Sequence, residues 1–344
     1  MNFIRNFWTT KSRLQKVVII GSFVFLFCIG IGVGYALYLL DKTEDMVDGS
    51  YQEIDREEDT SSLRPDPVSP VSDNVSVLFI GVDTGEERGF GEQSRSDALL
   101  YATFNVEKNT VKLLSIPRDT YTYIPVIDGF SKITHAHFYG GAKGSIETVE
   151  KFLNVPVDYY VRLNFDAFVE VVDALDGIQF DVPYELYEMD SHDNEDAIHL
   201  LPGEQLITGE EALALARTRK YDNDFERGKR QQAILKAIFN KSTSVASVFK
   251  LGAVLDAIGP NMSTNLTFDK MKGFLSYVTD ENVSIQSIEL EGDGGYMDDG
   301  GWYFQVDEES KEQVSQKLRE HLDIPTNYQF TSELTNEYGI YLMQ

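Results

Sequence analysis

The stretch RTRKYDNDFERGKRQQAILKAI, Arg217 to Ile238, places charged and apolar side chains on one helical face. From Phe225 it reads as a helix, with Asp224 positioned to cap the first backbone N–H groups. Residues three and four apart form a stripe of Arg227, Arg230, Gln231, Ile234, Leu235 and Ile238. Because the apolar end of the stripe must face the core, its basic end faces the rim of that core. The positive end of the helix dipole lies there, so the sequence predicts an anion site.

Two further arginines precede this helix. Thr208 and Glu211 have the spacing of a capping box and predict a helix that ends near Arg217. Arg217 and Arg219 are two residues apart, so on an extended segment both side chains would point toward the next helix. Four arginines could form the bidentate contacts that a diphosphate requires. The alternative is a solvated basic face paired with nearby carboxylates, and the stripe shared with apolar residues argues against it.

The overall composition is that of an acidic globular protein. The chain has 344 residues, a formal net charge of -26 at pH 7 and a sequence pI near 4.5. This charge excludes nucleic acid and anionic lipid as partners of the bulk surface, which makes a local basic site more conspicuous. The chain is long enough for one large domain or two average ones, and its single cysteine, Cys28, excludes an intramolecular disulfide.

The N-terminal part is predicted to cross a membrane once. Residues 1–16 carry basic and no acidic side chains, and Val17 to Leu40 contains no charge. At about 1.5 Å per residue this run can span the roughly 30 Å hydrocarbon layer. The basic flank predicts a cytoplasmic tail and an exported domain, with a cleaved signal peptide as the alternative. Residues 41–74, acidic and proline-containing, are predicted to be a flexible stalk before a domain at 75–344.

The domain reads as an α/β fold because strand and helix patterns alternate. Strands are predicted at 75–82, 98–105, 111–116, 157–163, 178–182, 283–290 and 302–306. Helices are predicted at 145–153, 165–175, 245–258, 268–278 and 308–321, and the two helices described above fall within 208–240. A hairpin turn joins the second and third strands. If the first two strands are also antiparallel, Asp83, Asp97 and Arg118 meet at one sheet edge.

Three other features imitate binding motifs. Gly140 to Ser145, GGAKGS, lacks the order of a phosphate loop and predicts a helix start. His135 and His137 lack a third metal ligand nearby. The acidic run Asp293 to Asp299 lacks the spacing of a calcium loop and predicts a hairpin loop. Any chemistry would therefore fall to carboxylates, arginines and a metal ion.

Five motifs carry a family resemblance: VLFIGVD, SRSDALL, SIPRDTY, SKITHAH and RTRKYDNDFERGKRQQ, in this order between residues 75 and 240. This part of the chain resembles the LytR-CpsA-Psr family. The resemblance implies an α/β/α sandwich around a mixed sheet, with an apolar tunnel for a polyprenyl chain. It implies transfer of an anionic glycopolymer, such as teichoic acid or capsular polysaccharide, from a polyprenyl diphosphate to peptidoglycan outside a Gram-positive membrane. Helices 165–175 and 245–258 are apolar enough to line such a tunnel, although an ordinary packed core explains them equally well.

The resemblance also implies roles for individual residues. Asp83 and Asp97 correspond to magnesium ligands. The diphosphate-binding set corresponds to Arg95, Arg118, Lys132, Arg217, Arg219, Arg227, Arg230 and Gln231. The catalytic set corresponds to Arg118, Asp119, Arg217, Arg219 and Asp224. Asp97, Asp119 and Asp224 are each candidates for the base that the acceptor hydroxyl needs.

Two alternatives to a transferase remain open. A membrane regulator could bind the polyprenyl lipid and signal through its short cytoplasmic tail, although residues 1–16 contain no recognisable domain. A hydrolase of the lipid diphosphate would use the same side chains and would differ only in its acceptor. Analysis of the reaction products separates these three functions.

Overall fold

The computed structural model describes residues 49–56, 60–82, 94–192, 194–218, 220, 224–242, 261–274, 277 and 283–324. They belong to one compact unit, Val47–Gln344. The predicted tail and membrane span at 1–40 lie outside the described residues, as does the predicted helix at 245–258. Within the described part of the chain, no helix has the length and hydropathy that a membrane span requires.

A six-stranded mixed sheet forms the centre of the fold. In spatial order its strands are β11 (Met262–Thr264), β6 (Tyr159–Asn164), β1 (Val75–Val82), β2 (Ser96–Asn105), β3 (Thr110–Ile116) and β12 (Ser284–Ile288). β1 and β2 are antiparallel, as are β2 and β3, whereas β6 runs parallel to β1 and β12 parallel to β3. The predicted α/β class is therefore confirmed, and so is the antiparallel order of the first three strands.

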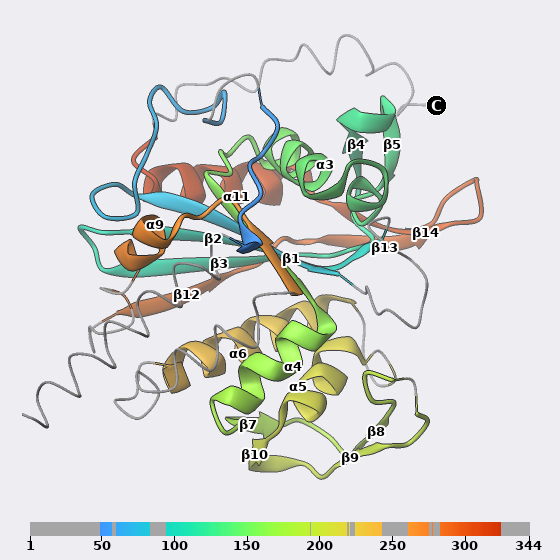
Figure 1. The fold of residues 1–344 in the computed structure, drawn as a ribbon. Helices are drawn as coiled ribbons and strands as arrows, with labels where there is room; N and C mark the ends of the chain where they lie inside the picture. Colours follow the sequence, from blue (N-terminus) through green and yellow to red (C-terminus); the bar gives the residue numbers. More distant parts are fainter. Residues whose placement is uncertain are drawn as a thin grey trace, which may run out of the picture. The chain divides into compact units, whose positions relative to one another are not determined.

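Helices α3 (His135–Leu153) and α11 (Glu308–His321) cover one face of the sheet (Figure 1). Alternate side chains of a strand point to opposite faces, so Leu78 and Ile80 of β1 share this side. They are buried in the largest core cluster together with Ile146 of α3 and Leu318 of α11. Positions 79 and 81, occupied by Phe79 and Gly81, therefore face the opposite side of the sheet.

Helices α4 (Phe165–Ala174), α5 (Gly209–Arg217) and α6 (Asp224–Ser242) lie on that opposite face (Figure 1). The strand pair β7 (Ile178–Val182) and β10 (Gly203–Ile207) packs with them into a second core cluster that includes Val172, Ala212 and Ile234. The start of α5 is fixed by the predicted capping box, since Thr208 accepts from the backbone of Glu211 while the Glu211 side chain accepts from that of Thr208.

Smaller elements surround this framework. They are the strand pairs β4 (Tyr121–Ile124) with β5 (Gly129–Lys132), β8 (Leu186–Glu188) with β9 (Ile198–Leu200) and β13 (Gly292–Tyr296) with β14 (Trp302–Val306), the 3-10 helix η2 (Pro125–Ile127) and the helix α9 (Phe268–Gly273). The acidic run 293–299, predicted as a loop, begins inside β13. The helix predicted from Ser145 begins at His135 and is kinked where Gly141 adopts a φ of 58°.

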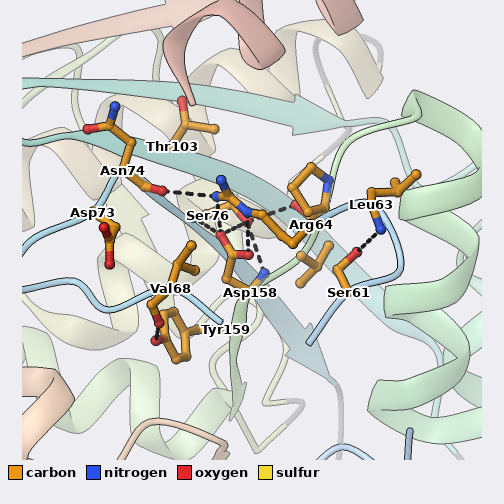
Figure 2. A network of polar contacts seen from close by, with 12 residues as sticks. Ser61, Leu63, Arg64, Val68, Asp73, Asn74, Ser76, Thr103, Asp158 and Tyr159 are labelled. Carbon is orange, nitrogen blue, oxygen red and sulfur yellow. Dashed lines mark hydrogen bonds and ion pairs between the residues drawn. The ribbon is translucent and has the colours of Figure 1, made fainter. Parts of the chain in front are cut away.

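Residues 49–56 and 60–74, here called the N-terminal strap, pack on the domain and do not form the predicted flexible stalk. Figure 2 shows the main contact, in which Arg64 binds both carboxylate oxygens of Asp158 at 2.9 and 2.6 Å. Asp158 also accepts from the backbone N–H of Ser76 at 2.8 Å, and Ile54 joins the main core. The strap is held by the buried ion pair of Arg64 with Asp158 and by the buried side chain of Ile54. The acidic composition of the segment gives no indication of these two contacts.

Candidate active site: an apolar cavity with a basic end

A cavity of about 470 Å³ lies between the sheet and the layer of α4, α5 and α6. This volume falls within the range of ordinary ligand pockets. Most of the lining is apolar: Phe79, Ile80, Leu100, Val161, Leu163, Phe165, Phe168, Leu213, Ile234 and Leu235. The cavity therefore suits the hydrocarbon part of a ligand. Phe165 and Phe168 belong to one of the two helices predicted to line a lipid tunnel.

Charged and polar side chains also line the cavity: Asp97, Arg217, Arg227 and Gln231, which we call its polar end, and the ion pair of Glu188 with Lys220 at 3.5 Å. Asp97 lies near the start of β2, at the sheet edge where β1 and β6 end. Arg217 is the last residue of α5, and its guanidinium carbon lies 4.8 Å from the ring centroid of Phe165, directly after β6. These side chains consequently gather at one edge, next to the N-terminal part of α6.

The inward orientation predicted for the α6 stripe is confirmed. Arg227 is only 5% exposed and Ile234 only 1%, and both line the cavity with Gln231 and Leu235. A charged arginine is therefore held at the end of an apolar cavity, close to the positive pole of a 19-residue helix. The arrangement favours a ligand with an anionic head and an apolar chain.

Arg230, predicted to bind the diphosphate, is buried but is not among the residues that line the cavity. Its Nε donates to the carbonyl of Leu215 at 2.9 Å and its Nη2 donates to the carbonyl of Thr218 at 2.7 Å. These carbonyls lie at the end of α5, where backbone acceptors lack helical partners. Arg230 thus positions the segment that carries Arg217.

A chain of ion pairs leads away from the polar end. Asp97 pairs with Arg118, the Nε of Arg118 lies 3.6 Å from Asp119, and the Nζ of Lys132 lies 2.8 Å from the other oxygen of Asp119. The predicted convergence of Asp97 with Arg118 is confirmed. Asp119 is 4% exposed, and two cations compensate for the burial of its charge.

Three predicted site positions cannot be placed in this geometry. Asp83, Arg219 and the side chain of Asp224 lie outside the described residues, although the backbone of Asp224 begins α6. Val82, which precedes Asp83, pairs with Ser96, which precedes Asp97.

His135 lies near the ion pairs of Arg118, Asp119 and Lys132. The sequence pattern offers it only as a possible metal ligand. Its Nδ1 is 2.8 Å from the hydroxyl of Ser131. Burial lowers the pKa of His135, and the positive charges of Arg95 and Lys132 lower it further. Arg95, which is exposed, is thereby placed near this cluster. Only the fold could reveal this, because Arg95 and His135 are far apart in the sequence.

Of the two predicted magnesium ligands, Asp97 is among the described residues and Asp83 is not. Asp97 offers carboxylate oxygens at the polar end and is partly accessible. Among these residues there is no group of three or more His, Cys, Asp or Glu side chains that could hold a metal ion. Magnesium often takes only one or two protein carboxylates, with phosphate and water completing its shell. The donor set at Asp97 fits that pattern.

Comparison with known proteins agrees with this geometry. The profile of the LytR_cpsA_psr family matches residues 37–320. The polyisoprenyl-teichoic acid–peptidoglycan teichoic acid transferase TagU of Bacillus cereus is 37% identical over 295 residues, which cover 85% of this chain and 93% of TagU.

Two solved structures of a related protein, TagT, contain bound molecules. TagT bound to LIIa-WTA has a TM-score of 0.69 and 37% identity, covering 79% of this chain and 100% of that one. TagT with bound octaprenyl pyrophosphate lipid has a TM-score of 0.64 and 34% identity over the same shares of the two chains. The mixed central sheet and its flanking helices are thus those of known family structures. The chain belongs to the LytR-CpsA-Psr family.

Proposed function

We propose that this protein transfers an anionic glycopolymer from a polyprenyl diphosphate carrier to a hydroxyl group of peptidoglycan. The observation that carries the proposal is the apolar cavity that ends at the buried Arg227. A polyprenyl chain fits its apolar walls, and the diphosphate fits its basic end. The names of TagU and of the lipid-bound TagT structure support the same assignment.

The reaction is a phosphoryl transfer. The acceptor oxygen attacks the phosphorus that carries the polymer, the bond to the polyprenyl phosphate breaks, and the acceptor proton passes to a base. Arg217 and Arg227 stabilise the charge that develops on the phosphoryl oxygens, and positioning contributes much of the remaining rate enhancement. Asp97 and Asp119 are the candidates for the base among the described side chains.

Magnesium is part of this proposal, with Asp97 as one ligand and Asp83 as the expected second. When bound, the ion would neutralise charge on the diphosphate. Arg118, which pairs with Asp97, holds the carboxylate at the polar end. The uncharged run 17–40 is proposed to anchor the chain in the cell membrane, with the domain on the outer side.

The test is a product analysis with the full-length protein in membranes, a polyprenyl diphosphate-linked anionic polymer and peptidoglycan. We expect polymer covalently joined to peptidoglycan. Free polymer would instead identify a hydrolase, and the absence of any product would favour a lipid-binding regulator. A chelator and the variant Asp97→Ala should each abolish transfer, whereas Leu206→Ala, on the distant strand β10, should leave it unchanged. Transfer that persists in the chelator would exclude the metal.

A further inference from the structure

The ribbon formed by β4 and β5 has two different faces. Thr122 and Ile124 point to one face and are buried. The opposite face carries Tyr121, Tyr123, Phe130 and Lys132, since Tyr121 pairs with Lys132 and Tyr123 with Phe130 across the strands. Directly opposed residues of an antiparallel pair share a face. The ribbon therefore presents aromatic rings away from the core and a lysine at one end.

The aromatic rings form a connected row. Tyr123 and Phe130 have ring centroids 5.6 Å apart, Phe130 and Tyr121 are stacked at 5.5 Å, and Tyr121 meets Tyr303 of β14 edge-on at 5.1 Å. Phe130 remains 52% exposed, although aromatic side chains of this size are usually buried. We call Tyr121, Tyr123, Phe130 and Tyr303 the aromatic row. Tyr121 and Tyr123 are half-buried and Tyr303 is buried at 8%, so Phe130 is the ring that the row presents to solvent. A large apolar ring exposed on such an aromatic support is a candidate binding surface.

Carboxylates border the aromatic row. The Tyr123 hydroxyl donates to Asp128 at 2.5 Å, and the Tyr303 hydroxyl donates to Asp299 at 2.6 Å. Both aspartates can accept further hydrogen bonds, because each carboxylate has several lone pairs. The surface thus combines an apolar ring with hydrogen-bond acceptors.

The row ends at the candidate active site. The Nζ of Lys132 lies 5.5 Å from the ring centroid of Tyr303 and 2.8 Å from Asp119. Asp119 continues through Arg118 to Asp97 at the polar end of the cavity. In a phosphoryl transfer the attacking and leaving oxygens are roughly in line. With the lipid inside the cavity, the acceptor must approach the polar end of the cavity from outside. The Tyr303 end of the aromatic row lies on that side.

We propose that the aromatic row binds the sugar rings of the glycan acceptor and delivers one hydroxyl to the polar end. This inference rests on the proposed function. Phe130, flanked by the half-buried rings of Tyr121 and Tyr123, would pack on the C–H face of a sugar, while Asp128 and Asp299 accept hydrogen bonds from sugar hydroxyl groups. A membrane surface fits less well, because these carboxylates and the net charge of -26 oppose contact with anionic lipid.

Direct binding of an N-acetylglucosamine hexamer to the full-length protein in detergent tests the proposal. The variant Phe130→Leu keeps an apolar side chain but removes the flat ring, and we expect it to bind the hexamer about five- to tenfold more weakly. Phe130→Trp, which keeps a ring, should bind like the wild type. Leu206→Ala, an equally exposed apolar position on β10, serves as the control. A thermal melt of each variant checks that the fold is retained.

The kinetic counterpart is a rise in the KM for the glycan acceptor in Phe130→Leu, with unchanged binding of a short polyprenyl diphosphate. Hexamer binding that does not depend on residue 130 would overturn the proposal. It would also be overturned if Phe130→Leu instead lost binding to phosphatidylglycerol vesicles, because the row would then be a membrane contact. Failure of the proposed transferase function would give a different result from failure of this inference. In that case the wild type would show no transfer, while hexamer binding would still depend on the ring at residue 130.

Discussion

Arg227 and Arg230 lie three residues apart on α6, and both are buried, with exposed fractions of 5% and 7%. Arg227 lines the cavity, whereas Arg230 donates to the carbonyls of Leu215 and Thr218. Gln231 combines the two roles, since it lines the cavity and donates to the carbonyl of Ala216 at 3.2 Å. Neighbouring side chains of one stripe thus divide between lining the cavity and supporting the end of α5.

This division predicts different consequences for the same substitution. Arg227→Lys keeps the charge but loses the planar fork, so binding of a short polyprenyl diphosphate should weaken about tenfold. Arg230→Lys should chiefly lower the free energy of unfolding, by about 2 kcal/mol, because a lysine cannot reach both carbonyls in the geometry of a guanidinium. Calorimetry and denaturant titration measure the two effects. Equal binding by the wild type and Arg227→Lys would place Arg227 outside the ligand site.

At the scale of elements, the close contact of α5 with α4 sets the position of Arg217. Gly209 begins α5, and its backbone N–H donates to Asp173 of α4 at 2.7 Å. A Cβ atom at this position would collide with the backbone carbonyl of Val169. The two helices can approach this closely only because residue 209 has no side chain.

Gly209→Ala should therefore lower the free energy of unfolding by about 2 kcal/mol or more, since the helices must separate. The matched control is Gly295→Ala, where an added Cβ meets no atom within 4 Å. Denaturant unfolding of the two variants gives the comparison. If both variants unfold like the wild type, the α4–α5 contact is not as tight as the structure indicates.

At the scale of the whole domain, the cavity exists because two layers meet without filling the space between them. β1 illustrates this, since Leu78 packs into the main core, Phe79 and Gly81 border the cavity, and Ile80 contacts both. On the other side of the cavity, Phe168 and Leu213 come from different helices. The N-terminal strap stabilises the layered core from outside through Arg64 and Asp158.

The predicted membrane topology is a property of the whole chain. Because the basic flank of residues 1–16 precedes the uncharged run 17–40, we expect the domain to lie outside the cell. Protease added to intact wall-less cells should degrade the domain, whereas a cytoplasmic protein used as a control should survive. Protection of the domain until the membrane is permeabilised would show that the orientation is reversed.

Local sequence signals determined much of this protein. The capping box of Thr208 and Glu211 predicted α5, the mainly apolar run VSVLFIGV predicted β1, and the stripe through Arg227 and Ile234 predicted a charged residue at the rim of the core. Each signal depends on residues within a few positions of one another. Helical periodicity and backbone capping act at that range, so they can be read without knowing the fold.

Contacts between distant segments were decided only by the tertiary structure. Nothing near Arg64 in the sequence indicates that it pairs with Asp158, and nothing near Arg230 indicates that it caps α5. The row from Tyr123 to Tyr303 likewise joins segments far apart in the chain. A side chain's partners depend on which surfaces the packed layers bring together, and the buried groups must then satisfy one another because water is excluded. For that reason the sequence alone could predict the arginines but could not say which of them line the cavity.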